Sequence, residues 1–203
     1  MRFLVLTKSA KHKNLCVAGV DLETYKLVRL VSNADGKELS SREFCYNGQP
    51  IDILSEINIT CSSVPLVIQT ENYLLQKINS VIREYRQDEL NDILKKIEQV
   101  DLLSGNSYYV SPEYAHRIKK SLMVAEVNNF ETCTKINNNR QKRTKASFYY
   151  NRQYFNDLSV TDPDYFNQDV TLSKCKVVLS ISEAPFGEGD RHYIFVAKIF
   201  STN

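Results

Sequence analysis

The stretch from Thr132 to Asn156 combines the two kinds of side chain that bind single-stranded nucleic acid. It contains six positively charged residues, no acidic residue and five aromatic residues. Single-strand binders line a cationic groove with aromatic rings on which bases stack. The net charge of the chain is +2, so the remaining residues sum to −4 (2 minus 6) and the positive charge is local. The candidate binding residues in this stretch are Lys142, Arg143, Lys145, Tyr149, Arg152 and Tyr154.

The same stretch also has a purely structural interpretation. Its aromatic residues can be core residues of a strand pair, and "KINNNRQKRTK" can be a solvated loop. Successive side chains of a strand point to opposite faces, so Phe148 and Tyr150 share one face while Tyr149 and Asn151 share the other. At most half of the rings therefore lie on a binding face. Alternation does not decide between Tyr149 and Tyr154, because Asn151 can start a turn.

Arg29 is a charged residue inside an apolar segment, "KLVRLV", that is typical of a β-strand. A repeat of two places it on the same face as Leu27 and Val31. One interpretation is an internal ion pair, with Asp21 across a hairpin as the candidate partner. The other is that the guanidinium, which carries five N–H donors, contacts a phosphate or a base. The residue pattern leaves both open.

Motifs for catalysis and metal binding are weak. The chain has three widely separated histidines and no phosphate-binding loop, nucleophile elbow or zinc-protease motif. Asp157, Asp162 and Asp164 have the chemistry to hold a divalent cation, but aspartates in turns more often bind their own backbone. The five cysteines are scattered without C-x-x-C spacing, which is typical of reduced thiols in a cytoplasmic protein. We expect no enzymatic activity, metal or cofactor.

The elements that position these residues are mostly strands. Apolar runs and alternation predict strands within 3–6, 14–21, 26–32, 52–61, 121–127, 146–165 and 175–200. In residues 71–100 the apolar residues recur at spacings of three and four, which predicts one long or two shorter amphipathic helices. Ser111 and Pro112 predict the start of another short helix.

Two β-rich halves separated by helices predict two small barrels, because closure of a sheet removes its exposed edges. The chain of 203 residues is long enough for two such domains, and 42% of its residues are hydrophobic. No apolar run approaches the eighteen residues of a membrane span. We expect a mainly β protein with a helical insert near 71–100, divided into an N-terminal barrel of residues 1–110 and a C-terminal barrel of residues 111–203.

Several short motifs occur in a suggestive order: "NLCVAGVDLETYKLVRLVSN", "DILSEINITC" followed by Pro65, "SFYYNRQYFNDLSVTDP" and "KVVLSISEAPFGEGDRHYIFVAKI". Together they resemble a family of prokaryotic proteins described as dual OB-fold domains. The resemblance implies two OB-like barrels that bind nucleic acid or nucleotides, often in defence-type gene neighbourhoods, and it assigns no catalytic residues. OB barrels bind ligands on the face of their second and third strands, where Arg29 is expected to lie.

The leading hypothesis is a cytoplasmic, non-enzymatic protein that binds single-stranded nucleic acid or a nucleotide and has no membrane partner. The alternative is an interaction or regulatory module that docks a partner protein through the helical insert. A third interpretation is an enzyme acting on nucleic acid with a metal held near residues 157–164.

Overall fold

The computed structural model describes residues 1–11, 14–97, 100–103, 108–136, 140–185 and 190–201. The chain separates into two compact units, Met1–Gln99 and Val100–Asn203. The sequence placed the boundary between residues 110 and 111. The intervening segment belongs to the C-terminal unit because β8 (Tyr109–Val110) pairs with β13 (His192–Ser201), the last strand of that unit.

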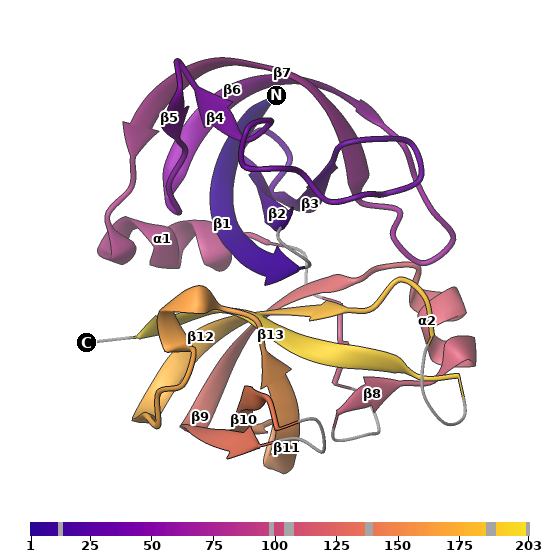
Figure 1. The fold of residues 1–203 in the computed structure, drawn as a ribbon, viewed down its shortest axis with the longest axis vertical. Helices are drawn as coiled ribbons and strands as arrows, with labels where there is room; N and C mark the ends of the chain where they lie inside the picture. The colour runs from indigo at the N-terminus through magenta and orange to yellow at the C-terminus, as the bar shows by residue number, and fades with distance from the viewer. Residues whose placement is uncertain (12–13, 98–99, 104–107, 137–139, 186–189, 202–203) are drawn as a thin grey trace. The chain divides into compact units, whose positions relative to one another are not determined.

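The N-terminal unit is a closed five-stranded barrel with the strand order β1-β2-β3-β7-β6. Strands β3 and β7 are parallel, and the other neighbours are antiparallel. Figure 1 shows these strands wrapped around their own core. The elements are β1 (Arg2–Lys11), β2 (Asn14–Asp21), β3 (Lys26–Val31), β4 (Cys45–Tyr46), β5 (Gln49–Pro50), β6 (Ser55–Ser63), β7 (Asn72–Glu84) and α1 (Gln87–Leu94).

Strands β1 and β2 approach each other very closely at Gly19. A Cβ atom at this position would lie 2.0 Å from the carbonyl oxygen of Leu4 and 2.6 Å from the ring of Phe3. Only glycine fits such an approach without a shift of the backbone. Phe3 therefore reaches the core of the barrel, where it is fully buried with Val17 and Val28.

The prediction of helices throughout residues 71–100 is wrong for residues 72–84, which form strand β7. The register between β6 and β7 shifts three times, and each shift adds one residue to β7. Leu75, Ile78 and Val81 consequently stand opposite alternate residues of β6 although they are three residues apart in sequence. Regular β-bulges thus convert the two-residue repeat of a strand into a three-residue repeat that imitates a helix. Among the described residues of this range only α1 is helical, and its apolar face is buried.

The C-terminal unit has a six-stranded sheet with the order β11-β10-β9-β12-β13-β8. A parallel pairing of Ser159 and Val160 with Phe195 and Val196 joins β11 to β13 and closes the sheet. The elements, with β8 and β13 as above, are α2 (Pro112–Ile118), β9 (Leu122–Ile136), β10 (Lys142–Tyr150), β11 (Gln153–Val160), η1 (Pro163–Tyr165) and β12 (Thr171–Ile181).

The two barrels share one strand order although no sequence repeat links them. In the N-terminal barrel β1 pairs with β2 and β6, and β3 pairs in parallel with β7. In the C-terminal barrel β9 pairs with β10 and β12, and β11 pairs in parallel with β13. This arrangement confirms the predicted mainly β fold with two OB-like barrels. The short helix expected at Ser111 is also confirmed, because the Ser111 hydroxyl accepts a hydrogen bond from the N–H of Tyr114 (3.3 Å) at the start of α2.

In the described parts of the chain, neither helix has the length and apolar character needed to cross a membrane.

Candidate nucleic-acid interface

Strands β10 and β11, the second and third strands of the C-terminal barrel, divide their side chains cleanly between core and surface. Thr144, Ala146 and Phe148 of β10 are buried. Phe148 stacks between Phe130 and Phe155 at centroid distances of 6.1 and 5.8 Å, so two of the five aromatic residues of the stretch, Phe148 and Phe155, belong to the core, in line with the structural interpretation. The alternate residues point outward. We call this surface the β10–β11 face and define it by Lys135, Arg143, Lys145, Tyr149, Tyr154, Asp157 and Ser159.

Tyr149 and Tyr154 form an exposed aromatic pair on this face. They stand directly opposite each other in the register of β10 and β11, with ring centroids 5.1 Å apart and planes inclined by 44°. Their exposed fractions are 41% and 48%. The turn between them consists of Asn151 and Arg152, with φ angles of 49° and 65°. This two-residue turn keeps the alternation in phase across the hairpin, so both tyrosines face outward.

Asp157 neutralises part of the basic stretch. Its Oδ1 accepts a hydrogen bond from the Lys135 Nζ (2.8 Å), and its Oδ2 lies 3.5 Å from the Nζ of Lys145. Lys145 also donates to the carbonyl oxygen of Asp157 (3.1 Å) and to the hydroxyl of Ser159 (3.0 Å). Lys145 is therefore anchored on the face by an ion pair rather than held as an unpaired cation.

The electrostatics of Asp157 support this assignment. Partial burial raises the pKa of its carboxyl, but the hydrogen bond from Lys135 and the charge of Lys145 outweigh burial and leave the pKa below its ordinary value. The same contact raises the pKa of Lys135. Both shifts favour the charged forms of Asp157 and Lys135.

The remaining candidate cations are exposed at the two ends of the hairpin. Lys142 and Arg143 lie at the start of β10, and Arg152 lies in the turn beside the tyrosine pair. Arg143 donates to the neutral side-chain oxygen of Gln141 (2.9 Å) rather than to a carboxylate. Among the residues that the structure describes, none of these three cations forms an ion pair. The face thus combines the charge of Arg143 with two exposed rings, and Lys142 and Arg152 lie exposed at the two ends of the hairpin beside it.

Arg29 lies in the N-terminal unit and does not belong to the β10–β11 face. It is partly buried in β3, opposite Ala18 of β2 and Asn72 of β7. Its backbone N–H donates to the carbonyl oxygen of Glu71 (2.9 Å), a residue that is only 3% exposed. The sequence named Asp21 as the ionic partner. The register instead places Asp21 opposite Lys26.

The carboxylate of Asp21 serves the turn that follows β2. It accepts hydrogen bonds from the N–H of Glu23 (3.1 Å) and the hydroxyl of Thr24 (2.7 Å). The residues of β2 that point away from the core residue Val17 are also covered, because Ala18 is 4% exposed and Val20 is fully buried. The outer side of β2 therefore lacks the open, polar surface that its counterpart β10 has.

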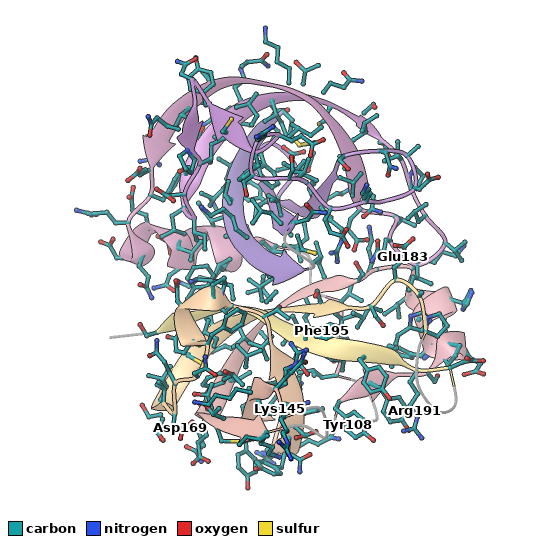
Figure 2. The ribbon with its side chains drawn as sticks, viewed as in Figure 1. Tyr108, Lys145, Asp169, Glu183, Arg191 and Phe195 are labelled. Atoms are coloured by element: carbon teal, nitrogen blue, oxygen red, sulfur yellow. The ribbon has the colours of Figure 1, made fainter. Side chains whose placement is uncertain are left out.

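Sequence reasoning missed a second group of aromatic residues with an arginine. Tyr108 stacks on Tyr193 with centroids 6.0 Å apart, and the Arg191 guanidinium lies 4.4 Å from the ring centroid of Tyr109. Arg191 also donates to the hydroxyl of Tyr108 (3.4 Å). We call these four residues the β8–β13 cluster; Figure 2 labels Tyr108 and Arg191 in the same unit as Lys145. The sequence signal for this cluster consists of "YY" at 108–109 and "RHY" at 191–193. These two segments come together only because β8 pairs with β13.

The aspartates near η1 are engaged in structural contacts. Asp162 is fully buried, and its carboxylate accepts hydrogen bonds from the N–H groups of Asp164 (3.2 Å) and Ile199 (3.0 Å). Lys198 donates to Asp162 (3.3 Å) and to Asp164. In the described part of the chain, no three His, Cys, Asp or Glu side chains are grouped so as to hold a metal ion.

Comparison with known proteins agrees with the two-barrel architecture. No curated protein and no solved structure matches the chain. A family model described as the dual OB-containing domain matches residues 1–199, a range that includes every strand of the first barrel and most of the last strand of the second. The chain therefore belongs to the family of dual OB-containing domains.

Proposed function

We propose that this protein binds single-stranded nucleic acid on the β10–β11 face of its C-terminal barrel. The observation that carries the proposal is the exposed pair of Tyr149 and Tyr154 on the second and third strands of an OB barrel. OB barrels use the face of these strands to bind oligonucleotides. The three available cations, Lys142, Arg143 and Arg152, supply contacts for the phosphate backbone.

The arrangement favours a single strand over a duplex. In a duplex the bases are stacked on one another, so their faces are not available to protein side chains. Unstacked bases lie flat against exposed rings, an interaction worth roughly 1–3 kcal/mol per base. Tyr149 and Tyr154 each offer one such ring, and the flanking charges fix the path of the backbone on either side of them.

The proposal describes a binding protein rather than an enzyme, a protein-docking module or a metal protein. The alternative of partner docking depended on a long helical insert, and the structure replaces most of that insert by strand β7. From the family resemblance alone, we place the proposed binding in the cytoplasm, in prokaryotic defence. Deletion of the gene, followed by challenge with foreign nucleic acid, tests that role separately from binding.

Fluorescence anisotropy with labelled single-stranded DNA and RNA of about twelve nucleotides, titrated at several salt concentrations, tests the proposal. Each neutralised phosphate releases counterions, so three contacts predict a slope of log K against log[salt] of about −2. Replacing Lys142 and Arg143 by glutamine should flatten that slope by about 1.4 for every sequence tested.

The matched control replaces Lys77 and Lys95 by glutamine, which removes the same charge from exposed positions of the N-terminal unit. Its slope should equal that of the unmodified protein. Absence of binding to DNA and RNA at low salt would refute the proposal, as would an equal effect of the control pair.

A further inference from the structure

We infer that the β8–β13 cluster is a second base-stacking subsite, which holds a nucleotide of the same strand that occupies the β10–β11 face. This inference rests on the proposed function. Nothing in the first site requires Tyr108, Tyr109, Arg191 or Tyr193, and their contacts join an edge strand of two residues to the start of β13.

The cluster lies on the outside of the barrel. His192 and Ile194 of β13 are each 2% exposed, and Val110 of β8 is 3% exposed, so these residues point inward. Tyr193 of β13 and Tyr109 of β8 occupy the alternate positions and are partly exposed. Rings packed only to fill the core would lie among the inward residues, and these rings do not.

Strand pairing connects the cluster to the first site. Strand β12 occupies one edge of β13, and β8 and β11 pair with consecutive stretches of the other edge. Because β11 and β13 are parallel, Tyr154 near the start of β11 and Tyr193 near the start of β13 lie toward the same end of the barrel. Further along both strands the register places Lys145, Ser159 and Phe195 side by side on β10, β11 and β13.

The chemistry of the cluster suits a base more than a phosphate. A guanidinium plane and an aromatic ring both present flat faces on which an unpaired base stacks. Asp190 precedes Arg191 and is exposed, so the local charge is nearly balanced. The subsite should therefore contribute stacking without adding to the salt dependence, in contrast to Lys142 and Arg143.

The subsite predicts that binding depends on length in a residue-specific way. An oligothymidylate of about three nucleotides is long enough for the tyrosine pair alone, whereas one of about twelve reaches both sites. Tyr193→Ala and Arg191→Ala should each weaken binding of the long oligonucleotide by about fivefold to a hundredfold. The affinity for the short oligonucleotide and the salt slope should stay unchanged.

Two controls separate a binding role from a structural one. Arg117→Ala removes the guanidinium that lies 4.7 Å from the ring of Tyr114 on α2, a similar contact outside the proposed path, and should change neither affinity. Arg191→Lys keeps the charge but loses the planar group, so it should weaken binding of the long oligonucleotide. This variant keeps the test valid if Tyr193→Ala proves unstable in a thermal melt.

The outcomes distinguish this inference from the function on which it rests. If substitution of Tyr149 weakens binding of the long oligonucleotide but substitution of Tyr193 or Arg191 does not, the second subsite is refuted and the proposed function stands. Equal losses for short and long oligonucleotides would refute it as well. If the unmodified protein binds neither, the proposed function itself fails and the inference fails with it.

Discussion

The carboxylate of Asp157 reduces the number of cations in the basic stretch that are available to a ligand. Asp157 is the first residue after that stretch, and it pairs with two of the six cations counted in the sequence. Its pKa is below the ordinary value, so these pairs stabilise the folded state above the ordinary aspartate pKa and are lost as pH falls through the lowered one. At neutral pH the pairs persist, and Lys135 and Lys145 contribute little to an external anion.

Asp157→Asn should strengthen binding rather than weaken it. The substitution keeps the shape of the side chain, and asparagine tolerates the φ of 60° at this position. Release of two lysines should raise affinity at low salt and steepen the slope of log K against log[salt] by about 1.4. Anisotropy titrations measure both quantities. An unchanged slope would show that these lysines do not face the ligand.

Arg29→Ala distinguishes the two interpretations of that residue. Glu71 is almost fully buried next to the position at which β7 pairs with Arg29, and a buried carboxylate requires a positive partner or several donors. We therefore expect a loss of stability on the order of 3–5 kcal/mol, with binding unchanged at temperatures where the variant is folded. Chemical denaturation measures the loss. Weaker binding with an unchanged unfolding midpoint would instead identify Arg29 as a ligand contact.

At the scale of elements, the β10–β11 hairpin carries the proposed stacking. Tyr149→Ala or Tyr154→Ala should reduce affinity by roughly 1–3 kcal/mol and leave the salt slope unchanged, because stacking is not a charge effect. Tyr149→Phe and Tyr154→Phe keep the rings and should bind nearly as well as the unmodified protein. A loss shared by the phenylalanine variants would assign the effect to the hydroxyl groups rather than to stacking.

Elements were predictable from the sequence where local pattern and tertiary structure agree. The strands around Arg29, the capped start of α2 and the split of the aromatic stretch into core and surface all follow from alternation and turn chemistry. Strand β7 was not predictable in this way, because three bulges gave its apolar residues a helical spacing. The pairs of Asp157 and the β8–β13 cluster depend on register between distant segments, which no local pattern contains.

At the scale of the whole molecule, two barrels with one strand order have different surfaces. The outer side of β2 in the N-terminal barrel holds buried apolar residues such as Ala18 and Val20, whereas its counterpart β10 carries Lys145 and Tyr149. Duplicated architecture therefore does not imply duplicated binding. We expect one strand of nucleic acid per chain, bound by the C-terminal barrel.

Cysteine alkylation tests which barrel is occupied. Cys133 is exposed on β9, opposite Lys145, and Cys45 lies in the N-terminal unit. A bound oligonucleotide should slow alkylation of Cys133 severalfold and leave that of Cys45 unchanged, as measured by mass spectrometry. Cys175 serves as an internal unreactive reference, because burial raises the pKa of its thiol to about 12. Slower alkylation of Cys45 alone would assign the ligand to the N-terminal barrel.

The parallel pairing that closes the C-terminal barrel has a consequence during synthesis on the ribosome. The N-terminal barrel can close once β7 has emerged, but Ser159 and Val160 at the end of β11 must wait for β13 before their outer edge is paired. In that interval β11 presents an open edge to other nascent chains, a recognised route to aggregation. The kink at Asp157, with its charge and its positive φ, interrupts the edge midway. Asp157, which pairs with two lysines in the folded protein, therefore also lies where its charge can hinder association of the unpaired β11 edge during synthesis.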